Sequence, residues 1–324
     1  MKRYLMIPVG IVIICLAFLA GWMQFHDQES TQIVPMRTVV DGTGTEIQIP
    51  THPKRVVILN IANLDMYYAV GGEVVGKPKS SYYSKDLLNA TKDVPSIGSL
   101  HSPSVEAIIG MHPDLVIGVN VPFNTNLRHM LSQANIPLYI NNLNTYDDVV
   151  NTLRFFGELT DHQDVANVTA KRAEDHYNKV VALAKEEQGP RSLIIFGSPG
   201  SFSMATNTSF SGNLLKTLGA YNIADADSSA VGDYVPLSME FIIKENPEVI
   251  FFISMTPKPD SIETFKRDML ESSAWQDVAA VKSGRIYYLS GGLFALNPGT
   301  PINEALDIMY KDLYGKEVPY DESA

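Results

Sequence analysis

Two loops of the sequence carry side chains that can bind a metal ion. His101 precedes a short helical segment, and Met255 follows a buried apolar run, Val249–Ile253. Both loops are expected beyond the carboxyl ends of strands, where α/β lobes bind ligands. Imidazole and thioether together form a familiar axial pair for heme iron. Each residue also has an ordinary interpretation, because loop histidines are usually surface residues and a methionine after a strand usually packs in the core.

Two acidic residues, Glu106 and Glu240, begin similar helical segments. A carboxylate in a first helical turn is stabilised by the helix dipole, which explains both residues without a function. A carboxylate pair separated by about 5–9.5 Å could instead hydrolyse glycosides. The sequence contains no G-x-S-x-G, P-loop or H-E-x-x-H motif, and we expect that the protein is not an enzyme.

The composition excludes several classes of protein. The chain has 324 residues, of which 45% are hydrophobic and 19% charged, as in a globular protein with ample core. Its formal net charge of −11 disfavours nucleic-acid binding. A single cysteine, Cys15, excludes a disulfide framework and a cysteine-ligated metal cluster. The seven histidines are scattered, and we could assemble no zinc or manganese site from them.

The N-terminal segment predicts a membrane anchor. Lys2 and Arg3 precede an uncharged run, Tyr4–Met23, that is long enough to cross a bilayer. The preceding positive charges predict that the rest of the chain lies on the extracytoplasmic side of the cell membrane. A cleaved signal peptide is the alternative. Cys15 could mark a lipoprotein, but it lies in mid-run and follows the bulky Ile14, so we favour the uncleaved anchor.

The remainder of the chain predicts an α/β fold with two Rossmann-like lobes. Asp41-Gly42-Thr43-Gly44 between β-favouring residues predicts a hairpin. Short apolar runs then alternate with helix-length segments, which favours parallel sheets covered on both faces. These runs are Arg55–Leu59, Leu115–Ile117, Leu138–Ile140, Leu193–Phe196, Val249–Ile253 and Ile286–Leu289.

One long helix is predicted between the lobes. No glycine or proline occurs between Gly157 and Gly189-Pro190, and apolar residues recur there at steps of three and four. We interpret this segment as a strut that joins the lobes, with an ordinary surface helix as the alternative. His162 and His176 are expected to be solvated helix residues. The apolar stripe comprises Ala166, Ala170, Ala173, Tyr177, Val180, Val181 and Ala184.

An internal repeat supports two similar lobes. The segment that starts at Val105 runs on to Pro113-Asp114-Leu115, and the segment that starts at Met239 runs on to Pro247-Glu248-Val249. Corresponding residues are 134 positions apart, and Glu106 corresponds to Glu240. Each unit predicts a helix that ends before a proline and leads into a buried strand. Chance is the alternative, since this arrangement is common, but the shared offset favours duplicated topology.

A set of motifs resembles the substrate-binding proteins of ABC importers for iron-siderophores, heme and cobalamin. The resemblance covers residues 38–316 and implies two Rossmann-like lobes joined by a single long backbone α-helix. The motifs are Asp41-Gly42, Ile49-Pro50, Pro53-Lys54-Arg55-Val56-Val57, Val74-Val75-Gly76, Ile97-Gly98, Pro113-Asp114-Leu115-Val116-Ile117, Trp275, Val281 and Gly284-Arg285-Ile286-Tyr287.

Within that family the chain is most similar to the heme-binding branch of the Gram-positive Isd type. The branch uses a methionine from the first lobe and a histidine from the second. His101 matches the methionine position and Met255 the histidine position, so the resemblance implies that the pair is kept but exchanged between lobes. The matching stretches are Gly76-Lys77-Pro78, Lys92–Gly98, Gly197–Phe202, Ala205-Thr206 and Ala280-Val281-Lys282.

The resemblance also implies partners. In the family, one exposed carboxylate on each lobe docks onto arginines of the permease subunits, and Glu106 and Glu240 match these positions. We therefore expect a monomeric protein that binds heme as its transported ligand and delivers it to an ABC permease. A ferric-siderophore or cobalamin carrier of the same fold is the alternative. The tyrosines that could serve such a ligand are Tyr67, Tyr68, Tyr82 and Tyr83.

The predicted organisation has six parts. We expect the anchor or signal segment, a stalk, the N-terminal lobe, the backbone helix, the C-terminal lobe and a tail. Their bounds are 1–24, 25–37, 38–157, 158–189, 190–317 and 318–324.

Overall fold

The computed structural model describes residues 34–198, 201–226, 231–254 and 259–319. The chain divides into two units, Met1–Pro35 and Met36–Ala324, and the second contains the folded body. The predicted anchor, Tyr4–Met23, lies outside the described residues. Among the described residues, no helix combines the length and the apolar character that crossing a membrane requires.

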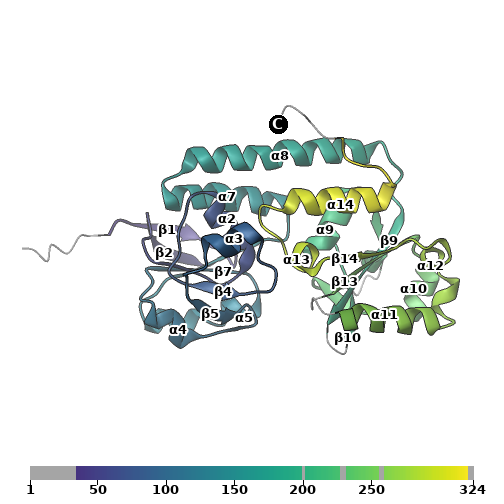
Figure 1. Ribbon diagram of the computed structural model, residues 1–324, viewed down its shortest axis with the longest axis horizontal. Coiled ribbons are helices and arrows are strands. Elements are labelled where there is room, and N and C mark those ends of the chain that lie inside the picture. The colour runs from purple at the N-terminus through teal and green to yellow at the C-terminus, as the bar shows by residue number, and fades with distance from the viewer. Residues whose placement is uncertain (1–33, 199–200, 227–230, 255–258, 320–324) are drawn as a thin grey trace, which may run out of the picture. The chain divides into compact units, whose positions relative to one another are not determined.

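The N-terminal lobe is built on a small parallel sheet whose strands are buried because they are continuous runs of branched apolar residues. Its strand order is β3-β7-β8. The predicted hairpin is present as the antiparallel pair β1-β2, and a third small sheet, β4-β5-β6, lies beside them (Figure 1). The strands are β1 (Met36–Val40), β2 (Glu46–Pro50), β3 (Val56–Ile58), β4 (Lys77–Lys79), β5 (Ser96–Ser99), β6 (Ser102–Pro103), β7 (Leu115–Val119) and β8 (Leu138–Asn141).

The C-terminal lobe contains one larger mixed sheet of order β12-β10-β9-β13-β14, with β11 paired to β9. β13 pairs in parallel with both β9 and β14 and is buried along its whole length. The strands are β9 (Arg191–Ser198), β10 (Ser201–Ala205), β11 (Tyr221–Asn222), β12 (Tyr234–Pro236), β13 (Val249–Ser254) and β14 (Ile286–Leu289). The α/β class and the parallel pairing that the sequence predicts are confirmed.

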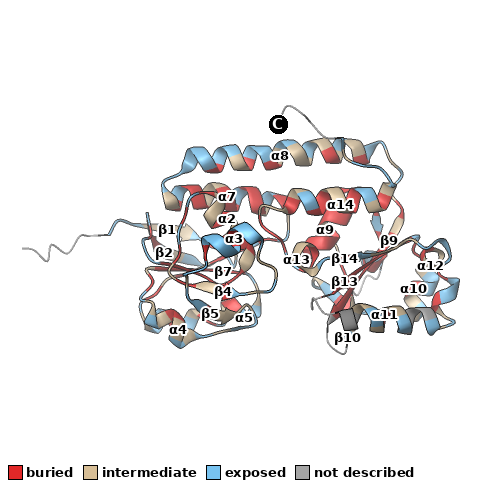
Figure 2. Cartoon of the chain, in the orientation of Figure 1, coloured by how far each residue is buried: buried red, intermediate tan, exposed pale blue. Residues whose placement is uncertain are grey.

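Helices cover both sheets, and the helices carry exposed residues on the side that faces solvent (Figure 2). The N-terminal ones are α2 (Ile61–Ala69), α3 (Lys85–Ala90), α4 (Val105–Gly110), α5 (Pro122–Thr125), α6 (Arg128–Gln133) and α7 (Tyr146–Thr160). The long helix is α8 (Gln163–Lys185). The later ones are α9 (Phe210–Thr217), α10 (Met239–Glu245), α11 (Pro259–Glu271), α12 (Ala279–Ser283), α13 (Gly291–Phe294) and α14 (Ile302–Tyr314), with the short 3₁₀ turns η1 (Ile223–Ala226) and η2 (Trp275–Asp277).

The long helix α8 packs along α7 and also along α14, the last helix of the chain (Figure 1). Most of its predicted apolar stripe is buried, including Ala166 and Ala170, which are fully inaccessible to solvent. Two members of the stripe, Tyr177 and Val181, are only partly buried. The helix begins later than the predicted residue 158, because Asp161 adopts a left-handed conformation that ends α7 at Thr160. His162 is exposed, as predicted. His176 differs from the prediction: it is only partly exposed and lies 2.7 Å from an Asp307 carboxylate oxygen of α14.

The predicted internal repeat extends to individual hydrogen bonds. Ser104 caps α4 by accepting a hydrogen bond from the backbone N–H of Ala107, and Ser238 caps α10 in the same way through Phe241. Both helices are followed by a residue in the left-handed region, His112 with φ 46° and Asn246 with φ 46°.

Arginines at the starts of β3 and β9 make repeated contacts as well: Arg55 directly precedes β3, and Arg191 is the first residue of β9. The Arg55 guanidinium donates to the carbonyl of Met111, and the Arg191 guanidinium donates to the carbonyl of Glu245. The backbone N–H of each arginine donates to the acidic residue that precedes the neighbouring strand, Asp114 or Glu248. The shared set of polar contacts favours duplicated topology over chance.

Candidate functional site

A cavity of about 650 Å³ opens between residues of the two lobes. The N-terminal lobe contributes the start of α2, the end of β4 with the segment that follows it, and the β5–β6 turn. The C-terminal lobe contributes α13 and the segment that follows it. Both walls carry aliphatic side chains, including Ile61, Leu100 and Leu296. The complete lining is Asn60, Ile61, Ala62, Pro78, Lys79, Ser80, Ser81, Tyr82, Ser99, Leu100, His101, Gly291, Gly292, Ala295, Leu296 and Asn297.

His101 lies on the wall of this cavity, as its predicted role requires. Ser99 pairs with Ser102, so Leu100 and His101 form the two-residue turn of the β5–β6 hairpin. The imidazole is exposed and makes an edge contact with the Phe123 ring, with centroids 5.0 Å apart and planes at 68°. A side chain at a hairpin tip with an accessible imidazole can bind a metal through a ring nitrogen.

Met255 lies outside the described residues, so its pairing with His101 stays a prediction. The described chain reaches Ser254, the buried last residue of β13. The Ser254 carbonyl lies against Gly291, where an added Cβ would come within 2.2 Å of the oxygen. Because Gly291 lines the cavity, β13 ends at the cavity wall.

Of the four tyrosines considered for a siderophore, Tyr82 lines the cavity. Its ring lies over Gly292, where an added Cβ would come within 2.7 Å of it, so it reaches from one lobe to the other. Burial raises the pKa of Tyr82. Tyr67 is instead a core residue against Phe156, with ring centroids 5.3 Å apart. Tyr83 donates its hydroxyl hydrogen to the Pro78 carbonyl at 2.6 Å.

Three polar residues of the cavity were not singled out from the sequence. Asn60 and Asn297 are 6% and 4% exposed, one in each lobe. Lys79 is the residue with a full positive charge in the described lining. Asn60 directly follows the run that forms β3, so the rule that places ligands beyond strand ends could have found it. Asn297 follows a short helix and carries no comparable signal.

Glu106 and Glu240 are exposed residues in the first turns of α4 and α10, and neither lines the cavity. The repeated caps place the two carboxylates at equivalent positions of the two lobes. An acid–base pair acting on a ligand in the cavity would need both side chains at its wall. The geometry therefore gives no support to glycoside hydrolysis. In the described part of the chain, no three His, Cys, Asp or Glu side chains gather as a metal-ion site.

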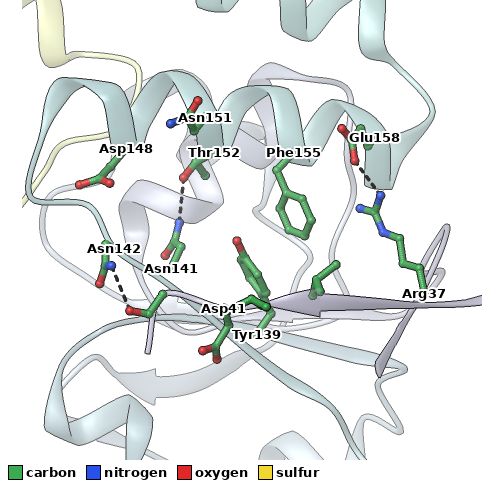
Figure 3. A pocket seen from close by; sticks show the side chains of 13 residues that line it. Arg37, Asp41, Tyr139, Asn141, Asn142, Asp148, Asn151, Thr152, Phe155 and Glu158 are labelled. Carbon is green, nitrogen blue, oxygen red and sulfur yellow. Dashed lines mark hydrogen bonds and ion pairs between the residues drawn. The ribbon is translucent and has the colours of Figure 1, made fainter. Parts of the chain in front are cut away.

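A second cavity of about 510 Å³ lies within the N-terminal lobe, between α7 and strands β1 and β8 (Figure 3). The Tyr139 and Phe155 rings stack there with centroids 4.6 Å apart, and burial raises the pKa of Tyr139 to about 12. At its edge Arg37 forms an ion pair with Glu158 at 2.6 Å. Because this cavity belongs to one lobe and lacks His101, we do not assign the predicted ligand to it.

Comparisons with known proteins agree with this arrangement. The periplasmic binding protein family matches residues 56–291. The high-affinity heme uptake system protein IsdE of Staphylococcus aureus (strain MRSA252) is 26% identical over 316 residues, covering 93% of this chain and 97% of that protein.

Solved structures show the same fold. An ABC transporter substrate-binding protein from Listeria monocytogenes EGD-e superposes with a TM-score of 0.73 at 23% identity, covering 82% of this chain and 100% of that one. IsdE of S. aureus in complex with heme gives 0.72 at 23% identity, over 80% and 98% of the two chains. The siderophore-binding protein BauB, bound to ferric iron and acinetobactin, gives 0.68 at 21% identity, over 88% and 100%.

The family match covers most of the folded body, including both repeated units and the cavity wall up to Gly291. It accounts for the two lobes, the long helix and the cavity between them. The chain belongs to the periplasmic binding protein family.

Proposed function

We propose that this protein binds heme outside the cytoplasm and delivers it to an ABC permease for iron acquisition. The observation that carries the proposal is the position of His101 on the wall of the cavity between the lobes. The likeness to IsdE, a heme uptake protein, supports the same ligand. The protein performs no chemical step in this proposal, because its work is binding and release.

The cavity suits a flat, apolar ligand with acidic groups. Its volume of about 650 Å³ lies within the range of small-ligand sites. Aliphatic residues such as Ile61 and Leu296 can contact a porphyrin face, and Lys79 supplies positive charge for its carboxylates. His101 would bind the iron through a ring nitrogen, and Met255 would provide the second axial ligand.

Glu106 and Glu240 would dock the protein onto the permease. Both are exposed, and the repeated helix caps present them from equivalent positions of the two lobes. Carboxylates facing arginines form charge-assisted, bidentate hydrogen bonds. One such contact on each lobe would orient both lobes over the two permease subunits. The N-terminal segment, Tyr4–Met23, would hold the protein at the membrane surface in this proposal.

A ferric-siderophore carrier is the second candidate, because Tyr82 lines the cavity and the BauB structure has the same fold. A cobalamin carrier of the same fold is included in this second candidate. Equilibrium titration of the purified protein with hemin, a ferric hydroxamate, a ferric catecholate and cobalamin separates these ligands. The proposal expects hemin to bind at least about tenfold more tightly than the other three. If a ferric siderophore or cobalamin binds more tightly than hemin, the proposal that heme is the ligand is wrong.

A further inference from the structure

The last helix of the chain, α14, carries a row of polar side chains that contact the N-terminal lobe and the long helix. Thr300 comes just before the helix, and Asn303 and Asp307 follow at steps of three and four. This spacing places side chains on one face of a helix. In Figure 1, α14 lies beside α7, and both helices run along α8. The row therefore belongs to the part of the molecule where helices of both lobes meet.

The first two residues of the row bind two different helices of the N-terminal lobe. Thr300 donates its backbone N–H and its hydroxyl hydrogen to Asp65 of α2, at 2.8 and 2.5 Å. Asn303 Oδ1 accepts a hydrogen bond from the Tyr146 hydroxyl, at the start of α7. The beginning of α14 is thus bound to α2 and to α7.

The third residue of the row binds the long helix. Asp307 Oδ1 lies 2.7 Å from Nε2 of His176 in α8. The Tyr146 hydroxyl is also 3.0 Å from the carbonyl oxygen of Ala173, one turn earlier in α8. Tyr146 is only 3% exposed, so its hydroxyl depends on these protein acceptors rather than on water. Three helices, α2, α7 and α8, therefore share polar contacts with the first half of α14.

The segment that leads into α14 forms part of the cavity wall. Residues 295–297 line the cavity from the C-terminal lobe, and Ala62 lines it from the N-terminal lobe. Gly299 lies against Ala62, where an added Cβ would come within 2.9 Å of the Ala62 carbonyl oxygen. The polar row thus begins three residues after the wall, at a point where the two lobes touch.

The second half of α14 is bound to the C-terminal lobe instead. The Tyr314 hydroxyl donates to the carbonyl of Leu218, which ends α9. The Arg285 guanidinium, just before β14, donates to the carbonyl of Leu313 at 2.7 Å. The two halves of α14 therefore have their polar contacts in different lobes.

We propose that α14 is a clamp that fixes the relative position of the lobes and holds residues 295–297 in place as cavity wall. The clamp consists of the contacts of Thr300, Asn303 and Asp307. Hydrogen bonds weaken steeply when their atoms separate, so a movement of one lobe away from the other must first break these contacts. The clamp does not depend on which ligand the cavity binds.

Spin labels on the two lobes test the clamp in the full-length protein without ligand. Asp86 of α3 and Ser273, which follows α11, are exposed and belong to different lobes. Asp86→Cys and Ser273→Cys in a Cys15→Ser background accept one label each. Double electron–electron resonance then measures the distance between the labels. The labelled protein with an intact clamp should give one narrow distance distribution.

Three variants of this labelled protein separate the clamp from the rest of the helix. Thr300→Val, Asn303→Ala and Asp307→Ala together remove the clamp and should broaden the distribution and add longer distances. Tyr146→Phe removes one hydroxyl from the clamp and should broaden the distribution less. Tyr314→Phe is the matched control, because it removes one hydroxyl from the second half of the same helix. It should leave the distribution narrow.

A second readout rests on the proposed function. Loss of the clamp should loosen the cavity wall and speed the release of hemin to apomyoglobin. We expect the triple variant to release hemin at least about tenfold faster than the wild-type protein, as the loss of one or two hydrogen bonds predicts. Tyr314→Phe should release hemin at the wild-type rate.

An unchanged distance distribution in Tyr146→Phe would overturn the inference, whether or not the triple variant folds. Equal broadening in Tyr314→Phe would overturn it as well. A broader distribution with an unchanged rate of hemin release would disprove that the clamp holds the cavity wall. Failure of the wild-type protein to bind hemin would overturn the proposed function, and the distance measurement would still decide whether α14 is a clamp.

Discussion

Asp65 and Thr300 connect the two lobes through one carboxylate oxygen. Asp65 Oδ2 accepts hydrogen bonds from the Thr300 backbone N–H at 2.8 Å and from the Thr300 hydroxyl at 2.5 Å. Asp65 belongs to α2, and Thr300 precedes α14. Gly299 lies directly against the same carboxylate, where an added Cβ would come within 2.9 Å of Oδ2. Burial raises the pKa of Asp65, and the two hydrogen bonds from Thr300 oppose that rise.

Thr300→Val tests this connection. It removes the hydroxyl donor and leaves the half-buried Asp65 carboxylate with one hydrogen bond fewer, so the free energy of unfolding should fall by about 1–3 kcal/mol. Thr300→Ser keeps the hydroxyl and should remain close to wild type. Urea unfolding of the three proteins measures the difference. Equal losses in Val and Ser variants would show that the hydroxyl does not matter.

The packing of α8 on α7 predicts a clear cost for Gly157→Ala. An added Cβ at Gly157 would lie 2.3 Å from the Cβ of Ala166 in α8, so the helices must move apart. Such overpacking destabilises a protein by about 1–3 kcal/mol. Gly110, the last residue of α4, has open space around its Cβ position, and Gly110→Ala should be neutral or stabilise by up to about 1 kcal/mol. Thermal unfolding compares the two variants, and a neutral Gly157→Ala would contradict the observed packing.

Asp41 predicts a pH-dependent contribution to stability. Burial alone would raise the pKa of Asp41, but hydrogen bonds from Thr43, Arg128 and Thr45 outweigh it and lower that pKa. A carboxylate whose pKa is lowered by folding stabilises the native state above its unfolded pKa, near 3.8, and loses this effect as the pH falls through the lowered value.

Asp41→Asn should therefore reduce the free energy of unfolding by about 1–3 kcal/mol near neutral pH. The gap to wild type should close as the pH falls below about 4. Denaturant unfolding at several pH values measures this gap, with the exposed Asp86→Asn as a control that should show little change. A gap that stays constant down to the lowest pH would contradict the assignment.

Replacement of Glu106 and Glu240 should impair heme transport without impairing heme binding. Replacing both by Ala should leave folding and heme binding nearly unchanged, because both side chains are exposed and lie away from the cavity. Heme uptake by cells should fall, and it should fall more than in either single variant, because one remaining ion pair could still hold the complex. Substitution of both by Lys should impair uptake further through like-charge repulsion. Wild-type uptake by the double Ala variant, or a loss of heme binding, would disprove the docking role.

Local patterns in the sequence predict much of the fold and part of the site. The hairpin at Asp41–Gly44, the buried strands and the alanine stripe of α8 follow from turn residues and hydrophobic periodicity, which act over short distances. His101 could be placed at a strand end because it lies in a loop between predicted elements. The helix boundary at Asp161 could not be predicted, because a left-handed non-glycine residue has only a weak sequence signal.

The remaining features depend on contacts between distant residues. Tyr67 and Tyr82 carry the same side chain, yet Tyr67 packs in the core and Tyr82 lies against Gly292 of the other lobe. His176 was expected in solvent because its partner Asp307 lies 131 residues away.

The visible absorption spectrum of the hemin complex tests the central claim most directly. The proposal predicts a 1:1 complex with low-spin bands, because His101 and Met255 would both coordinate the iron. His101→Ala should convert these bands to high-spin, and Met255→Ala should remove the methionine signature. His129→Ala, which replaces an exposed histidine of α6 that does not line the cavity, should leave the spectrum unchanged. A His101→Ala spectrum identical to that of the wild-type protein would contradict the account.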